Sequence, residues 1–166
     1  MPIFKAIAAM ASNHVIGNNG KLPWHIPEEL QWFRQTTLHQ ILLMGRKTFE
    51  SMGCRPLPYR TTYVLSSQKI SYEGIRAITS IDELSDLQET IWLCGGTHIY
   101  EQFLPLCSEL FLSVIHKPYE GDAFFPEFEH LFKKQSILKT TEVFDVQKWV
   151  RASQTNFEHT NYSPNV

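Results

Sequence analysis

The chain has 166 residues, of which 43% are hydrophobic and 19% are charged, and its formal net charge is −2. This length suits one domain with a substantial core, the small net charge argues against a nucleic-acid partner, and no apolar stretch is long enough to span a membrane. The seven histidines lack the spacing of metal ligands, and the three scattered cysteines indicate reduced thiols in a cytoplasmic protein, not a disulfide framework.

The predicted elements alternate between strand and helix. Ile3–Met10 is apolar apart from Lys5 and predicts a buried strand, and it lacks the basic lead-in of a signal peptide. A polar, glycine-containing loop, Ser12–Pro23, follows. The later expected elements are a helix at 27–38, a strand at 41–44, a short helix opened by 45–48, strands at 62–65 and 75–78, a helix capped by Ser80 and Glu83, a strand at 91–94, a helix at 97–104, a strand at 110–115, and strand-like runs at 137–144 and 149–157 joined by 145–147. We expect the tail after Tyr162 to be frayed.

Short apolar runs that alternate with helices are typical of a largely parallel sheet covered on both faces. The sequence shows no internal repeat and no linker. We therefore expect an α/β fold in which residues 1–166 form a single domain, with a central, mostly parallel eight-stranded sheet, helices on both faces and an antiparallel C-terminal edge.

Glu29 is the first candidate catalytic residue. Pro27 suits the first position of a helix, and Glu29 then shares a helix face with Phe33, with Leu30 alongside. The helix N-terminus favours the charged carboxylate, whereas an apolar pocket favours the neutral acid. A carboxyl group near that balance can bind a cationic or amidine-like ring and support protonation, while the alternative is an ordinary exposed first-turn acid.

Three strand ends carry groups that suit phosphates. Gly45-Arg46-Lys47-Thr48 and Gly95-Gly96-Thr97-His98 each place glycine and a hydroxyl at a helix start, and Ser66-Ser67 adds two small hydroxyls. Any one of them alone is also explained by a simple turn. Together, at the carboxyl ends of strands in one open sheet, they favour a dinucleotide site. A G-x-G-x-x-G fingerprint is missing, so the usual dehydrogenase module does not match.

Three further residues have individual interpretations. Arg60 suits bidentate binding of a substrate carboxylate, although an isolated arginine is more often a surface residue. Cys94 ends an apolar strand without an activating partner, and we interpret it as a structural thiol. Asp122 is a candidate tether for a nearby loop.

Several short motifs occur together and in a fixed order. They are Val15-Ile16-Gly17, Leu22-Pro23-Trp24, Pro27-Glu28-Glu29-Leu30, Met44-Gly45-Arg46-Lys47-Thr48-Phe49-Glu50-Ser51, Arg55-Pro56-Leu57-Pro58, Leu65-Ser66-Ser67, Gly95-Gly96 with Ile99-Tyr100, and Glu120-Gly121-Asp122. From about Ile3 to Phe157 the chain resembles bacterial-type dihydrofolate reductase. Glu29 stands where many bacterial members have Asp, Ser113 stands where Thr is usual, and Cys54 looks like an inserted residue.

This resemblance implies hydride transfer from NADPH to C6 of dihydrofolate and protonation of N5, in support of one-carbon metabolism. The implied catalytic residues are Glu29, Trp24 and Leu22, and the proton travels either directly from Glu29 or through a water ordered near Trp24. The implied substrate-binding residues are Ile7, Ala9, Glu29, Leu30, Phe33, Leu57, Arg60, Cys94 and Ser113. The implied cofactor-binding residues are Ala9, Ile16, Gly17, Gly45, Arg46, Lys47, Thr48, Leu65, Ser66, Ser67, Gly95, Gly96, Thr97, His98, Ile99 and Gln102.

Within that resemblance, Ser113 supports Glu29, Arg60 takes the glutamate carboxylate of the substrate, and the loop Ile16–Leu22 closes over the nicotinamide. Arg46, Ser66 and Ser67 favour NADPH over NADH, whereas His98 stands where an arginine often faces the adenosine 2′-phosphate. Expected partners are dihydrofolate and antifolate inhibitors, with no nucleic acid and no membrane, and we expect a monomer. The alternatives are a riboflavin-pathway reductase of similar fold and a non-enzymatic pterin- or nucleotide-binding paralogue.

Overall fold

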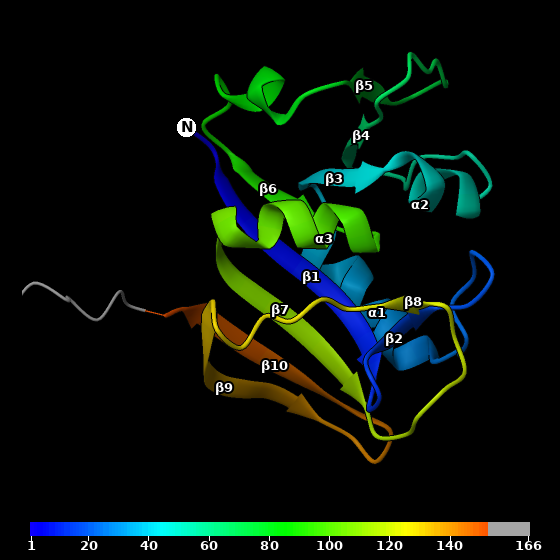
Figure 1. The fold of residues 1–166 in the computed structure, drawn as a ribbon, viewed down its shortest axis with the longest axis vertical. Coiled ribbons are helices and arrows are strands. Elements are labelled where there is room, and N and C mark those ends of the chain that lie inside the picture. The colour runs from blue at the N-terminus through cyan, green and yellow to red at the C-terminus, as the bar shows by residue number, and fades with distance from the viewer. Residues whose placement is uncertain (153–166) are drawn as a thin grey trace, which may run out of the picture.

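The computed structural model describes residues 1–152 and is built on one large sheet (Figure 1). Its strands run in the order β5-β4-β3-β6-β1-β7-β10-β9. Every neighbouring pair is parallel except β7 with β10 and β10 with β9. The eight strands are β1 (Ile3–Ala11), β3 (Ile41–Gly45), β4 (Thr61–Leu65), β5 (Arg76–Ile78), β6 (Thr90–Leu93), β7 (Cys107–Ile115), β9 (Phe132–Thr140) and β10 (Phe144–Arg151). This confirms the predicted eight-stranded α/β fold with an antiparallel C-terminal edge.

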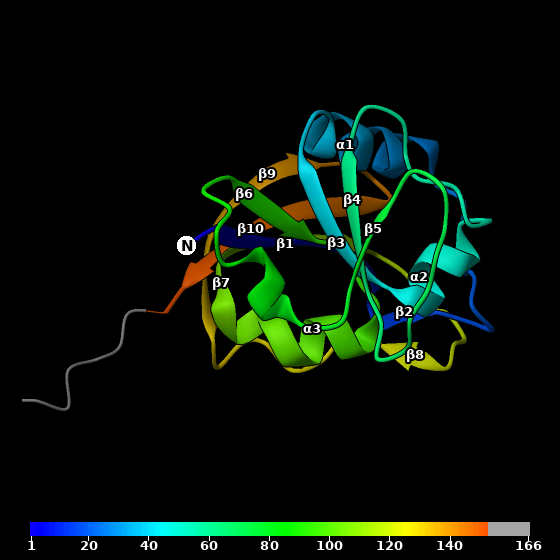
Figure 2. The ribbon, with the colours of Figure 1, turned by 90° about the horizontal axis from the view of Figure 1, so that it is seen from above.

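Helices cover both faces of this sheet, as expected, with α1 on one side and α3 on the other (Figure 2). The α-helices are α1 (Pro27–Thr37), α2 (Arg46–Ser51) and α3 (Thr97–Phe103), and two 3₁₀ helices lie at Ile81–Leu84 and Leu104–Leu106. Within residues 1–152 no helix is both long enough and apolar enough to traverse a bilayer.

Two apolar clusters explain why the short runs form strands. Side chains such as Leu43, Leu93 and Leu112 meet α3 on one face, while Leu42, Met44 and Val64 meet α1 and α2 on the other. Successive strand residues point to opposite faces of a sheet, so Leu42 and Leu43 face opposite sides. Both are nevertheless fully buried, because helices cover both sides. The continuous apolar runs are therefore the signature of a sheet buried on both faces.

The C-terminal hairpin corrects one prediction. Asp145–Gln147 do not form a turn, because they lie inside β10 and pair with β7, Asp145 with Val114. The chain instead turns at Thr141, whose Oγ1 accepts hydrogen bonds from the backbone N–H groups of Val143 and Phe144 at 3.1 and 2.9 Å. The predicted strand 149–157 is present as far as Arg151, and its residues 153–157, like the tail after Tyr162, lie outside the described part.

Three other boundaries differ from the prediction. Strand β9 covers Phe132–Thr140 instead of 137–144, since the turn at Thr141 ends it. Ser80 and Glu83 do form the expected capping box, but they open only the short 3₁₀ helix Ile81–Leu84, since few residues remain before β6. Strand β7 begins at Cys107 instead of Leu110, because its polar first half is anchored by Glu109, which forms an ion pair with Lys5 on β1 at 3.2 Å.

A small second sheet has no counterpart among the predicted elements. Strands β2 (Val15–Gly17) and β8 (Ala123–Phe124) pair antiparallel and hold the loop that follows β2. Asp122 ties the two segments together, since its carboxylate accepts the backbone N–H of Asn19 at 3.2 Å. The predicted role of Asp122 as a loop tether is confirmed.

Gly121 shows how closely these two segments approach. A Cβ atom on Gly121 would overlap with Cγ1 of Val15 and with the carbonyl oxygen of Gly17. We predict that Gly121→Ala lowers the free energy of unfolding by about 2–3 kcal/mol, because one of these neighbours must move. Urea denaturation measures this change. The exposed neighbour provides a control, since Glu120→Ala is expected to stay within about 0.5 kcal/mol of the wild type; equal stability of the two variants would contradict the predicted overlap.

Candidate active site

A cleft of about 1660 Å³ opens at the carboxyl ends of the parallel strands, on both sides of the junction between β6 and β1. This volume exceeds the range of about 300–1,000 Å³ that suits one drug-sized ligand. In open α/β sheets, ligands bind where the strand order reverses. The cleft therefore has the place and the size for two ligands side by side.

Most of the residues predicted from the sequence line this one cleft. Those that do are Ile7, Ala9, Ile16, Gly17, Leu22, Glu29, Leu30, Phe33, Gly45, Arg46, Lys47, Thr48, Leu57, Arg60, Leu65, Ser66, Ser67, Cys94, Gly95, Gly96, Thr97, His98, Ile99 and Gln102. Trp24 and Ser113 do not line it and lie in the protein behind it, 8% and 1% exposed. Seven segments of the chain thus converge on one cavity.

Glu29 is buried and not an exposed first-turn acid, since its relative exposure is 6%. Helix α1 begins at Pro27 as predicted, and Glu29 and Phe33, four residues apart, both face the cleft. Burial raises the pKa of Glu29 above its ordinary value, because the charged form loses its hydration. Of the two competing effects considered from the sequence, the apolar surroundings prevail.

Ser113 lies next to Glu29, and Trp24 is buried in an apolar cluster that includes Ile26 and Ala9. The Ser113 hydroxyl lowers the pKa of Glu29, but by less than burial raises it. Within residues 1–152, no atom meets the distance and angle criteria for a hydrogen bond with the Oγ of Ser113. The same holds for the indole Nε1 of Trp24. Each group therefore has hydrogen-bonding capacity left for a buried water or, for Ser113, for the Glu29 carboxyl group.

Arg60 is held in place by the protein itself. Its Nε donates to Thr37 Oγ1 at 3.0 Å, one terminal nitrogen to the carbonyl of Pro58 at 2.7 Å, and the other to the carbonyl of Arg34 at 2.9 Å. These three acceptors fix the plane of the guanidinium at the mouth of the cleft beside Leu57. An oriented guanidinium is suited to a carboxylate ligand.

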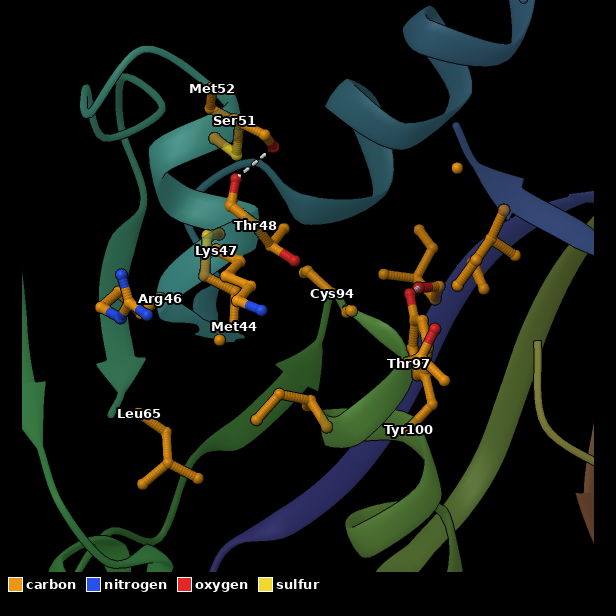
Figure 3. Close-up of a pocket in the computed structure, with 18 of the residues that line it drawn as sticks. Met44, Arg46, Lys47, Thr48, Ser51, Met52, Leu65, Cys94, Thr97 and Tyr100 are labelled. Carbon is orange, nitrogen blue, oxygen red and sulfur yellow. Dashed lines mark hydrogen bonds between the residues drawn. The ribbon is translucent and has the colours of Figure 1, made fainter. Parts of the chain in front are cut away.

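The two glycine-containing strand ends meet at the opposite half of the cleft, part of which Figure 3 shows in close-up. The Gly45 N–H donates to the carbonyl of Gly95 at 2.9 Å. Gly95 has a φ of 105°, which L side chains rarely adopt, and the Gly95–Gly96 peptide bond is cis. A Cβ on Gly96 would lie 3.1 Å from Thr48 Oγ1, so a larger residue at this position would force the Thr48 side chain to move.

Cys94 and Tyr100 also line the cleft. Cys94 is partly open to the cleft, but burial raises the pKa of its thiol to about 12, so it stays protonated and fits the structural interpretation. Tyr100 stands out from the sequence only as part of a motif. Its buried hydroxyl donates to the carbonyl of Ile7 at 2.7 Å, and the residue lines the cleft. The sequence signal that could have identified Tyr100 as a cleft residue is its position one helical turn after Gly96.

Comparisons with known proteins agree with this geometry. Residues 3–160 match the family described as dihydrofolate reductase. Among curated proteins, the chain is 43% identical over 128 residues to the dihydrofolate reductase of Haemophilus influenzae, covering 75% of this chain and 79% of that protein. It is 34% identical over 165 residues to the dihydrofolate reductase of Enterococcus faecium, covering 92% and 99%. Among solved structures, the Enterococcus faecalis dihydrofolate reductase complexed with NADP(H) and RAB-propyl superimposes with a TM-score of 0.84 at 36% identity, covering 90% of this chain and 96% of that one.

The raised pKa of Glu29 makes stability depend on pH. Between the ordinary pKa of 4.5 and the higher pKa of the folded state, the folded protein holds the proton more tightly, so the free energy of unfolding falls as pH rises. Glu29→Gln cannot ionise and escapes this loss, which is about 1.4 kcal/mol for each tenfold difference in proton affinity between the folded and unfolded states. We predict that Glu29→Gln is more stable than the wild type at neutral pH, and that this advantage shrinks as the pH is lowered toward 4.5.

Urea denaturation across that pH range provides the measurement. The matched control is Glu28→Gln, at an exposed position in the same helical turn, which is expected to gain no stability at neutral pH. An advantage of Glu29→Gln that is absent, or that is constant with pH, would contradict the assignment of a raised pKa.

Proposed function

Since this chain belongs to the dihydrofolate reductase family, we infer that it is the enzyme that reduces dihydrofolate to tetrahydrofolate with NADPH, and we propose roles for the residues of its cleft. The observation that carries these roles is a buried carboxyl group, Glu29, in the same cavity as two glycine-containing strand ends. A riboflavin-pathway reductase and a non-enzymatic paralogue are not favoured, because the family and the relatives found are dihydrofolate reductases.

The residues present fit NADPH. Gly45, Gly95 and Gly96 present backbone alone to the cleft, which lets a dinucleotide approach closely, and a Cβ at these positions would lie 3.1–3.3 Å from neighbouring side chains. Arg46 and Lys47 supply positive charge nearby. The other proposed cofactor contacts are Ala9, Ile16, Gly17, Thr48, Leu65, Ser66, Ser67, Thr97, His98, Ile99 and Gln102. NADPH, when bound, supplies the hydride. The protein contributes orientation and electrostatics to the transfer.

Glu29 is proposed to bind the 2-amino group and N3 of the pterin and to help protonate N5. Because burial raises its pKa, the carboxyl group keeps a proton at a higher pH than an exposed glutamate does. The proton passes directly or through a water at the unpaired Nε1 of Trp24, which is a free donor among the described residues. Ser113 is proposed to orient the carboxyl group from behind.

Apolar side chains are proposed to hold the rest of the substrate. Leu30, Phe33 and Leu57 flank the ring system, while Ile7, Ala9 and Cys94 form the wall of the cleft beside it. The loop Ile16–Leu22, which includes Leu22, lines the opening of the cleft. Closure of this loop would exclude water from the reacting atoms. Arg60 takes the glutamate carboxylate at the mouth of the cleft.

Domain organisation, oligomeric state, cellular location and partners complete the proposal. We propose one domain over residues 1–166 that acts as a cytoplasmic monomer on small molecules, with antifolates as inhibitors and without a nucleic-acid partner.

Glu29→Gln tests the proposed proton donor. We predict that the variant binds NADPH within about twofold of the wild type, while turnover falls about 10²–10⁴-fold, because the amide cannot supply a proton. Fluorescence titration with NADPH and the fall in NADPH absorbance on mixing with dihydrofolate give the two quantities. Glu28→Gln is the control, and turnover of Glu29→Gln equal to that control would exclude the role.

Arg60→Lys tests the substrate-binding end. Lysine keeps the positive charge but loses the planar fork and cannot satisfy Thr37 and the two carbonyls together. We predict about a tenfold rise in KM for dihydrofolate, with little change in the Kd for NADPH. An unchanged KM, or an equal loss of affinity for both ligands, would contradict a specific contact between Arg60 and the substrate.

A further inference from the structure

Arg46 is held by Glu50 through only one of its nitrogens. Its Nη1 donates to Oε1 and Oε2 of Glu50 at 2.9 and 3.1 Å, one turn later on α2. A guanidinium carries N–H groups on three nitrogens. Within residues 1–152, Nη2 and Nε of Arg46 meet no acceptor, so these donors remain available to a ligand.

Tyr72 fixes the Glu50 carboxylate from a different segment, the loop between β4 and β5. Its hydroxyl donates to Glu50 Oε1 at 3.0 Å, and its ring packs edge-on against the fully buried Phe49, with centroids 5.3 Å apart. Hydrogen bonds from Arg46 and then from Tyr72 lower the pKa of Glu50, which keeps it ionised. The carboxylate is therefore held from two sides.

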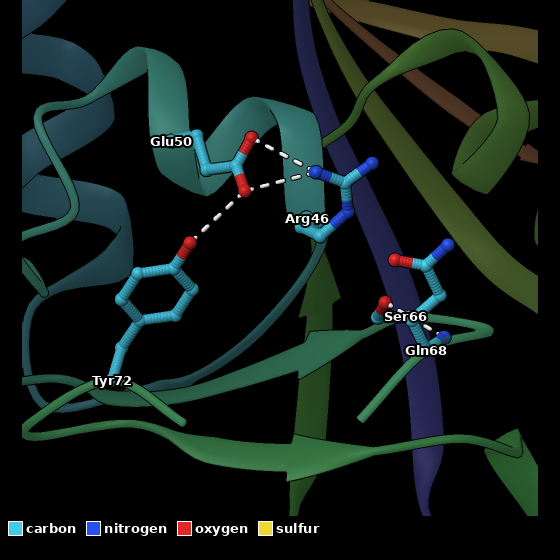
Figure 4. A network of polar contacts seen from close by, with 5 residues as sticks. All are labelled: Arg46, Glu50, Ser66, Gln68 and Tyr72. Carbon is cyan, nitrogen blue, oxygen red and sulfur yellow. Dashed lines mark hydrogen bonds and ion pairs between the residues drawn. The ribbon is translucent and has the colours of Figure 1, made fainter. Parts of the chain in front are cut away.

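Arg46 is the member of this network that lines the cleft. Gly45 pairs with Leu65 across β3 and β4, so Arg46 and Ser66 follow paired residues at the same edge, and both line the cleft. Glu50 and Tyr72 do not line it. Figure 4 shows Arg46 between Glu50 on one side and Ser66 on the other.

The energetics favour an effect on orientation over an effect on stability. The side chains of Arg46 and Glu50 are each 34% exposed, and such surface ion pairs stabilise a fold very little. An unrestrained arginine, however, loses rotamer freedom whenever it binds a ligand. Arg46 has already lost part of that freedom in the network, so less of it remains to be lost on binding.

We propose that Glu50 and Tyr72 are positioning residues that hold Arg46 ready for the adenosine 2′-phosphate and thereby set the preference for NADPH over NADH. This inference rests on the proposed cofactor contact of Arg46. The pair acts only through Arg46, since neither side chain reaches the cleft itself.

Binding of NADPH and NADH, each followed by quenching of tryptophan fluorescence, tests this role without relying on turnover. Glu50→Ala is expected to raise the Kd for NADPH about three- to tenfold and to leave the Kd for NADH within about twofold. Glu50→Gln keeps an acceptor for Arg46 and should recover most of the loss. Tyr72→Phe keeps the packing against Phe49 and should give a smaller loss in the same direction.

Arg46→Ala separates this inference from the contact on which it depends. We expect Arg46→Ala to weaken NADPH binding selectively, and Glu50→Ala to have no further effect in that background. If Arg46→Ala is selective but Glu50→Ala weakens both cofactors equally, changes neither, or strengthens NADPH binding, the positioning role is overturned alone. If Arg46→Ala does not distinguish the two cofactors, the proposed contact and the positioning role are both overturned.

Discussion

The burial of the Glu29 carboxyl group is the constraint on which the rest of the site depends. Removing a carboxylate from water costs free energy, and a glutamate that is only 6% exposed would ordinarily be replaced by an apolar residue. The start of α1 holds it there, with Phe33 one turn away facing the same cavity. A carboxyl group that retains its proton suits the protonation step that we propose for Glu29.

The sheet determines where the two halves of the chemistry meet. Strands β1, β3, β4 and β6 are parallel, so their carboxyl ends lie at one edge, and the reversal in strand order opens a cleft there. Gly45 at the end of β3 and Gly95 after β6 line one side of the cleft, where we propose that the cofactor binds, and α1 borders the other side. The small β2–β8 sheet and Asp122 hold the loop that lines the opening.

The elements predicted correctly are those whose signal is local. Apolar runs such as Leu42–Met44 identify strands buried on both faces, and Pro27 marks the start of α1. Long-range contacts left no such signal: the polar residues Asp145 and Gln147 suggested a turn, although pairing with β7 keeps them in a strand. The actual turn depends on the Thr141 side chain, which accepts hydrogen bonds from two nearby backbone N–H groups, and the apolar pattern does not report such bonds. The link from Glu50 to Tyr72 likewise joins residues 22 positions apart that no local pattern connects.

The most direct test of this account is a titration of the Glu29 side-chain carboxyl group by carbon-13 NMR, assigned with Glu29→Gln. Desolvation in the cleft predicts an inflection above the ordinary value of 4.5. Such a result would establish that the fold maintains a carboxyl group that ionises reluctantly at the place where a proton is needed. An inflection at or below 4.5 would mean that the helix N-terminus and Ser113 outweigh burial, and it would contradict the central claim.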